Sequence, residues 1–294
     1  MSPTSGFPMT RSIEGLGAIA AGYDLLICDV WGVVHNGVRA WPLACEALQR
    51  FRAGGGSVIL LTNAPRPNTA VTVQLEQLAV PPDTRDAIVT SGDLARDALI
   101  AAEARAVFHL GPARDLGIFE GLDVKRVPPE EADIVLNTGL FDDETETPED
   151  YDELIATMRS RGLHMICANP DLVVERGDQM IYCAGAIAER YQEAGGEVIW
   201  AGKPRMPVYE RVFAMAHELR GEPVPPSRAL AIGDAMRTDI AGGVAAGADI
   251  LFIASGIHSG DVMRGGEPDL NEVARLAEAA GARPDFVLDV LRWS

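Results

Sequence analysis

The sequence predicts an α/β protein built on a Rossmann-like parallel sheet. Short apolar runs alternate with helical segments in both halves of the chain, and this alternation is typical of βαβ units. Acidic residues directly follow two of these apolar runs. Ligands of open parallel sheets bind outside the carboxyl ends of the strands, so the pattern predicts a site at that edge.

Each predicted element follows from an apolar run or from helical periodicity. In the first part of the chain we expect strands at 23–29 and 57–62, and helices at 42–52 and 68–78. In the middle we expect strands at 106–110, 133–137 and 163–168, and helices at 148–161 and 184–194. In the last part we expect helices at 207–219 and 238–246, and strands at 228–233 and 249–253. The acidic run 142–147 is interpreted as a solvated loop before a helix.

Composition limits the classes of partner. The chain has 294 residues, of which 47% are hydrophobic, which is enough for one large or two smaller cores. Its formal net charge of -18 repels nucleic acid and anionic membranes at long range. We therefore expect neither as a partner. An anionic substrate would need a metal ion and a few well-placed cations.

The N-terminal region and the cysteines favour a cytoplasmic location. The apolar stretch 16–21 is short and interrupted by glycine, so it predicts neither a membrane span nor an export signal. The four cysteines show no C-x-x-C spacing, and we interpret them as reduced core residues.

Three carboxylates are candidates for a metal site. Asp29 directly follows Leu-Leu-Ile-Cys, where burying a carboxylate without a partner is costly. Asp234 and Asp239 lie on either side of a turn after another apolar run. Taken alone, Asp29 suits a turn cap and the other two suit the start of a helix capped by Thr238. If the three acids converge, a divalent cation is the simplest way to offset their repulsion.

Two further positions could hold an anion. Thr62 and Asn63 end an apolar run, where a hydroxyl and backbone N–H groups suit phosphate oxygens, although a helix N-cap is the alternative. Lys203 lies between Gly202 and Pro204, and its compact ammonium suits phosphate, although an isolated surface lysine is the alternative.

The order of these residues resembles the haloacid dehalogenase (HAD) superfamily of aspartate-nucleophile hydrolases, and the resemblance covers nearly the whole chain. Within it the sequence is most similar to class IIA, which contains sugar-phosphate, nucleotide and pyridoxal-phosphate phosphatases. The motifs that carry this similarity are Leu60–Arg66, Ala168–Asp171 and Ala201–Pro204.

The resemblance implies a HAD-like core with a smaller inserted α/β cap. Residues 1–103 and 198–294 would form the core domain, and residues 104–197 the cap domain. Caps of this class often carry a dimer interface, so a homodimer formed through the cap remains open beside a monomer.

The resemblance also implies roles for individual residues. Asp29 would attack phosphorus to give an aspartyl-phosphate, with Thr62 and Lys203 completing the catalytic set. A Mg²⁺ ion would be held by Asp29, Asp234, Asp239 and the backbone carbonyl of Trp31. Residues expected to contact a small phosphorylated metabolite are Trp31, Gly32, Asn63, Arg66, Asn169 and Asp171.

Trp31 departs from the family pattern. Most phosphatases of the family carry a second Asp there, which protonates the leaving oxygen, a contribution of about 10²–10⁴-fold in rate. Trp31 keeps the carbonyl and loses the acid. His35 is nearby and could substitute as the acid, although a loop histidine with another hydrogen-bonding role is the interpretation we prefer. A phosphatase restricted to good leaving groups is our main hypothesis.

Two other functions remain open. A non-catalytic or regulatory protein would bind a phosphorylated metabolite without turnover. A dehalogenase-like or phosphonate hydrolase is the second alternative, because the superfamily's dehalogenases carry an aromatic residue at this position. Those dehalogenases need no metal, so the retention of Asp234 and Asp239 argues against dehalogenation.

Overall fold

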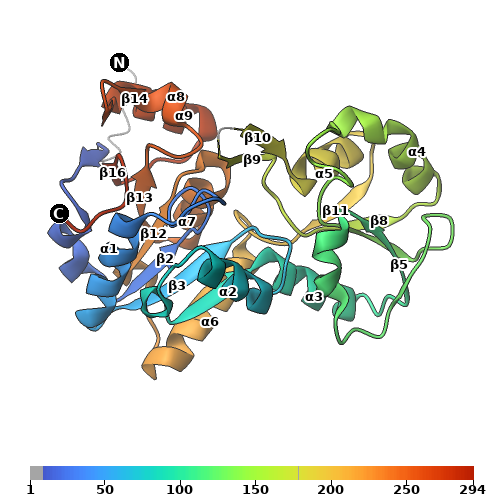
Figure 1. The fold of residues 1–294 in the computed structure, drawn as a ribbon, viewed down its shortest axis with the longest axis horizontal. Helices are drawn as coiled ribbons and strands as arrows, with labels where there is room; N and C mark the ends of the chain where they lie inside the picture. Colours follow the sequence, from blue (N-terminus) through green and yellow to red (C-terminus); the bar gives the residue numbers. More distant parts are fainter. Residues whose placement is uncertain (1–8, 178) are drawn as a thin grey trace, which may run out of the picture.

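The computed structural model describes residues 9–177 and 179–294, and a seven-stranded parallel sheet forms its larger part (Figure 1). All neighbouring strands in this sheet run parallel, which confirms the predicted fold class. In spatial order the strands are β1 (Arg11–Ser12), β16 (Phe286–Leu288), β13 (Asp249–Ile253), β12 (Ala229–Gly233), β2 (Leu25–Cys28), β3 (Ser57–Thr62) and β4 (Ala87–Thr90).

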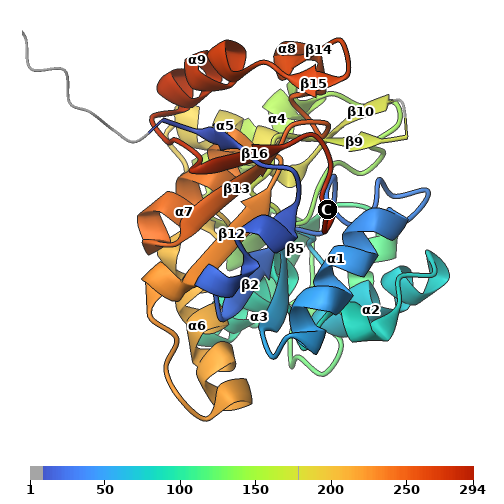
Figure 2. The same ribbon diagram turned by 90° about the vertical axis from the view of Figure 1, so that its left-hand side faces the viewer.

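The central strands are apolar throughout because both faces of the sheet are covered. Along β2, Leu26 and Cys28 face one core, whereas Leu25 and Ile27 face the other, as the two-residue period of a strand requires. On the first face lie α1 (Pro42–Ala53) and α2 (Asn68–Gln77); on the second lie α6 (Met206–Arg220), α7 (Ala241–Ala246) and α9 (Leu270–Ala280). Figure 2 shows α1 and α6 on opposite sides of the sheet.

A second parallel sheet is formed by the middle of the chain (Figure 1). In spatial order its strands are β11 (Glu197–Trp200), β8 (His164–Cys167), β7 (Ile134–Asn137), β5 (Ala106–Leu110) and β6 (Lys125–Arg126). One face packs against α3 (Ser91–Ala101), and the other against α4 (Asp152–Ser160) and α5 (Ala184–Glu193). The chain thus leaves the first sheet after β4 and returns to it at β12.

An antiparallel hairpin of β9 (Val173–Arg176) and β10 (Gln179–Tyr182) lies between the two sheets (Figure 1). The Trp31 indole Nε1 donates a hydrogen bond to the Glu175 carbonyl at 2.5 Å. The Gly177 backbone N–H donates to the Asn36 carbonyl at 3.4 Å. The hairpin is therefore docked on the loop that follows β2.

The remaining elements are short. They are α8 (Ser259–Val262), β14 (Met263–Arg264), β15 (Glu267–Pro268) and 3₁₀ turns at Leu16–Ala18, Ala20–Gly22, Pro82–Thr84, Ala113–Phe119, Pro148–Tyr151 and Pro226–Arg228. All four cysteines are buried free thiols, as predicted. Within the described residues, no helix combines the length and hydrophobicity needed to cross a membrane.

Most predicted elements are confirmed to within a few residues, with two local differences. The helix predicted from residue 238 starts at Ala241, because a π-helical turn over Met236–Ile240 precedes it. Thr238 lies inside that turn and does not cap the helix. The helix predicted from residue 148 begins as a 3₁₀ turn and becomes α-helical at Asp152.

Candidate active site

Three buried carboxylates meet at the carboxyl edge of the seven-stranded sheet. Asp29 follows β2 and Asp234 follows β12, and these strands are neighbours, with Cys28 paired to Ile232. Asp239 comes from the π-helical turn, which brings its carboxylate back over the end of β12. Carboxylate oxygens of the three residues lie within 4.8 Å of one another. The sheet register therefore brings together the acids that the sequence singled out.

Glycines allow the backbone to close around Asp234. A Cβ at Gly32, which has φ +84°, or at Gly256 would collide with the Asp234 carboxylate. The Ile257 backbone N–H donates to Asp234 Oδ2 at 2.9 Å. The loop after β2 and the loop after β13 thus both contact this carboxylate, and the predicted site residue Gly32 lies against it.

Lys203 is the cation of this cluster. Its Nζ donates to Asp29 Oδ1 at 2.5 Å, to Asp239 Oδ1 at 2.6 Å and to the Leu61 carbonyl at 3.1 Å. The residue is 3% exposed, so these contacts replace water around the ammonium group. The alternative of an isolated surface lysine is wrong for Lys203.

The charges of the cluster do not balance. Burial and the charge of Asp239 raise the pKa of Asp29 well above its usual range, although Lys203 lowers it. Burial and Asp239 likewise raise the pKa of Asp234 to about 7. Burial lowers the pKa of Lys203, but the carboxylates of Asp239 and Asp29 outweigh this and hold it well above its usual range. One ammonium facing three buried carboxylates leaves negative charge that a divalent cation would offset, and an all-oxygen donor set suits a hard cation.

Thr62 and Asn63 lie at the end of β3, next to the acidic cluster. Thr62 Oγ1 accepts a hydrogen bond from the Ala64 backbone N–H at 3.2 Å. Asn63 Oδ1 accepts from the Lys203 N–H at 2.9 Å and from Ser91 Oγ at 3.0 Å. Asn63 Nδ2 donates to Asp171 Oδ1 at 3.0 Å. The Asn63 side chain thus ties the lysine loop and the start of α3 to the end of β3.

Trp31 and His35 pack against each other beside the acidic cluster. Their rings are 5.1 Å apart in an edge-to-face arrangement. His35 is 1% exposed, and its Nδ1 accepts from the Gly37 backbone N–H at 2.9 Å. Burial and the charge of Arg66 lower the pKa of His35 to about 4. A neutral, buried imidazole is poorly suited to replace the missing acid.

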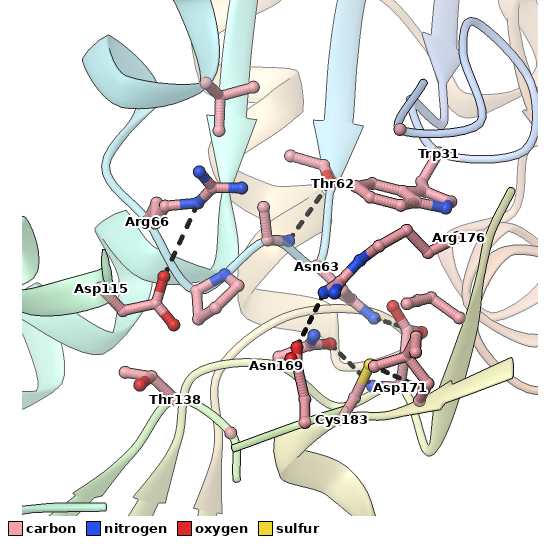
Figure 3. A pocket seen from close by; sticks show the side chains of 18 of the residues that line it. Trp31, Thr62, Asn63, Arg66, Asp115, Thr138, Asn169, Asp171, Arg176 and Cys183 are labelled. Atoms are coloured by element: carbon pink, nitrogen blue, oxygen red, sulfur yellow. Dashed lines mark hydrogen bonds and ion pairs between the residues drawn. The ribbon is translucent and has the colours of Figure 1, made fainter. Parts of the chain in front are cut away.

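Two adjoining cavities open from the cluster. The first, of about 250 Å³, contains the three acids and Lys203, and hairpin residues Val173, Val174, Glu175 and Gly177 also line it. The second, of about 300 Å³, extends toward the five-stranded sheet. The residues that line both are Trp31, Thr62, Asn63, Asp171 and Val174, and we call them the neck. Figure 3 shows the second cavity, with Trp31 and Thr62 above Asn169 and Asp171.

The remaining predicted residues line the second cavity. Arg66 lies there with its Nε 3.8 Å from Asp115 Oδ1, and its guanidinium donates to Gln74 Oε1 at 3.1 Å. Asn169 is 9% exposed, and its Oδ1 accepts from the Asp171 backbone N–H at 3.1 Å. All the sequence-predicted site residues thus lie in or beside the two connected cavities, and their individual roles stay predictions.

The sequence did not identify four charged residues of the second cavity, namely Arg114, Asp115, Asp143 and Arg176. Arg114 and Asp115 are adjacent in the 3₁₀ turn after β5, Asp143 lies in the loop after β7, and Arg176 ends β9; none belongs to a local motif. Interpreting 142–147 as a solvated loop is wrong for Asp143. Its side chain is 7% exposed because Arg114 and Arg176 both pair with it.

Comparisons with known proteins identify the family. A family model described as haloacid dehalogenase-like hydrolase matches residues 26–125, and a HAD-hydrolase-like model matches residues 200–293. A crystal structure of a haloacid dehalogenase-like hydrolase from Brucella suis 1330 is 46% identical, with a TM-score of 0.85, and the match covers 95% of this chain and 99% of that one.

Two curated relatives are more distant. A glycerol-3-phosphate phosphatase from Gallus gallus is 26% identical, over 95% of this chain and 94% of the relative. The 5'-nucleotidase YutF from Bacillus subtilis (strain 168) is 24% identical, over 80% of this chain and 88% of the relative.

Proposed function

This chain belongs to the haloacid dehalogenase-like hydrolases, and we propose that it is a cytoplasmic Mg²⁺-dependent phosphatase that acts on a small phosphorylated metabolite through phospho-Asp29. The observation that carries the proposal is the buried cluster of Asp29, Asp234, Asp239 and Lys203. The names of the two curated relatives, a glycerol-3-phosphate phosphatase and a 5'-nucleotidase, support a phosphate monoester as substrate.

Asp29 is the nucleophile in this proposal. Its Oδ1 accepts the Lys203 hydrogen bond, which leaves Oδ2 to attack phosphorus. Lys203 fixes the carboxylate orientation and offsets charge as the alcohol or phenol oxygen leaves. Water then cleaves the phospho-Asp29 bond, releasing phosphate and restoring the carboxylate.

A Mg²⁺ ion would neutralise phosphoryl charge when bound. The residues that would hold it are Asp29, Asp234, Asp239 and, through its carbonyl, Trp31. The protein's own residues prepare that site by burying the three carboxylates. Thr62 and the backbone N–H group of Asn63 suit the phosphoryl oxygens, whereas the Gly32 N–H already donates to the His35 carbonyl at 2.8 Å. The second sheet, which runs from Ala106 in β5 to Trp200 in β11, acts as the cap that shields the neck from water.

Trp31 limits the substrates in this proposal. Its indole N–H is used in the hydrogen bond to the hairpin, and an indole supplies no proton to a leaving oxygen. The lowered pKa of His35 keeps that side chain neutral near pH 7. Departure of the leaving group therefore depends on its own acidity, which favours aryl or acyl phosphates over alkyl phosphates.

The test is turnover of p-nitrophenyl phosphate and of glycerol 3-phosphate, each with Mg²⁺ and with excess chelator. We expect Mg²⁺-dependent hydrolysis of both esters, with kcat for the aryl ester at least about 10²-fold higher, the lower end of what a general acid contributes. Equal kcat values would contradict the leaving-group restriction.

The absence of an acid at position 31 also favours a second candidate, a protein that binds phosphorylated metabolites without turnover. Tight binding of a beryllium fluoride phosphate mimic with no hydrolysis of either ester would support this candidate over the phosphatase. Activity on an organohalide that is indifferent to chelator would instead favour dehalogenation.

A further inference from the structure

The second cavity brings three arginines together in a strongly acidic protein. The chain has a formal net charge of -18, yet among the described residues the arginines that line this cavity equal the aspartates in number. They are Arg66, Arg114 and Arg176, with Asp115, Asp143 and, in the neck, Asp171. A concentration of guanidinium groups beside a phosphoryl site has no role in the chemistry of Asp29 and therefore needs its own explanation.

The three guanidinium groups come from different parts of the fold. Arg66 follows β3 in the larger sheet, Arg114 lies in the 3₁₀ turn after β5, and Arg176 ends β9 in the hairpin. Arg114 and Arg176 donate to the same oxygen, Asp143 Oδ2, at 2.5 and 2.7 Å. One carboxylate is thus shared between two cations.

Arg66 is only partly compensated by its neighbours. Its Nε lies 3.8 Å from Asp115 Oδ1, beyond hydrogen-bond range. The same Nε is buried and has no hydrogen-bond partner among the described residues. Burial lowers the pKa of Arg66; the charge of Asp115 raises it in part, and the charges of Arg114 and Arg176 lower it further. An unpaired buried donor is costly, so the protein's own residues leave part of the hydrogen-bonding capacity of this guanidinium unused.

We propose, resting on the phosphatase function, that this cavity binds a second anionic group on the alcohol or phenol part of the substrate. Arg66 and Arg176 are its ligands, and Arg114 supports Arg176 through Asp143. The neck connects the two cavities, so a substrate extends from Asp29 past Trp31 and Thr62 to the arginines. Guanidinium groups bind planar carboxylates and tetrahedral phosphates alike, and either group fits.

The primary test compares two aryl phosphates of similar size and different charge. The substrates are 4-carboxyphenyl phosphate and 4-carbamoylphenyl phosphate, which both have phenol leaving groups and so avoid the limit set by Trp31. We expect kcat/KM to be about 10- to 100-fold higher for the carboxylate, as for other charge-assisted contacts. A third substrate, 4-sulfophenyl phosphate, shows whether a tetrahedral anion is preferred to a planar one.

Charge-removing variants assign the effect to this cavity. In Arg66→Gln and Arg176→Gln we expect the carboxylate-to-carboxamide ratio of kcat/KM to fall about tenfold or more. The matched control is Arg190→Gln. Arg190 lies in α5, pairs with Glu149 and Asp152 at the surface, and lines neither cavity. The ratio in this control should equal that of the native protein.

The outcomes separate this inference from the proposed function. Hydrolysis of all three substrates with ratios near one would overturn the anion site and leave the phosphatase intact. Unchanged ratios in both cavity variants would also overturn it. No hydrolysis of any aryl phosphate with Mg²⁺ would overturn the phosphatase itself.

Discussion

The acidic cluster and the arginine-lined cavity are built in opposite ways. Asp29, Asp234, Asp239 and Lys203 are each less than 10% exposed, and the two strand-end acids follow neighbouring strands of one sheet. The arginines come from loops and strand ends of two sheets and the hairpin, and their side chains are 27% to 50% exposed. Strand register can place the reacting atoms tightly, whereas loops can adapt to the rest of the substrate.

If the cluster performs the chemistry, losing the nucleophile has the largest effect. We expect Asp29→Asn to lower kcat for p-nitrophenyl phosphate by about 10⁴-fold or more, as for other covalent nucleophiles. Steady-state assays with saturating Mg²⁺ measure this. Asp97→Asn is the control, because Asp97 pairs with Arg211 on the surface. A variant retaining a tenth of native activity would exclude Asp29 as the nucleophile.

The burial of the cluster predicts that Lys203 also stabilises the folded protein. Removing one partner of a buried ion pair typically costs about 3–5 kcal/mol, and we expect this loss in the free energy of unfolding of Lys203→Met without metal. Urea unfolding at pH 7.5 measures it. Lys125, the only other lysine in the chain, lies on an exposed strand, so Lys125→Met is the control. Equal stabilities of the two variants would contradict the charge account.

His35 packs against Trp31 and lines the second cavity, and its buried neutral ring predicts acid sensitivity. Folding lowers its pKa from 6.5 to about 4. Its contribution to stability is therefore complete above pH 6.5 and is lost as the pH falls toward 4. Between pH 7 and pH 4.5, we expect the native protein to lose about 2–3 kcal/mol more of its free energy of unfolding than His35→Gln loses. Parallel pH curves would show that folding does not lower the pKa of His35.

Trp31 lines both cavities, and replacing it has the smallest expected effect. Installing the missing acid as Trp31→Asp should raise kcat for glycerol 3-phosphate by about 10²-fold, the low end for a general acid. Trp31→Asn is the control, because it removes the indole and the hairpin hydrogen bond without supplying a proton. A similar gain in both variants would attribute the change to hairpin release rather than acid catalysis.

The same contrast explains what the sequence could predict. The acids at the ends of β2 and β12 were predictable, because an apolar run followed by a carboxylate marks a strand end, and parallel strands bring such ends to one edge. The motif order then placed Thr62 and Lys203 nearby. Individual residues such as Asp143 and Arg176 carry no such signal. Their contacts depend on how separate loops and a hairpin meet, and local patterning does not encode this.

The wrong start predicted for the helix after β12 has the same physical origin. The sequence pattern predicted a helix from Thr238, but the π-helical turn places Asp239 over the end of β12 and delays the α-helix to Ala241. A side chain at residue 233 would collide with Asp239, so Gly233 permits this close approach. Tertiary packing of the Asp239 carboxylate overrides helix propensity here.

A crystal structure with Mg²⁺ and beryllium fluoride would locate both the metal ion and the nucleophile. We expect one Mg²⁺ ion between the carboxylates of Asp29, Asp234 and Asp239, and beryllium fluoride bonded to the Asp29 oxygen that does not face Lys203. Magnesium bound elsewhere, or beryllium fluoride absent from Asp29 at saturating concentrations of both reagents, would contradict it.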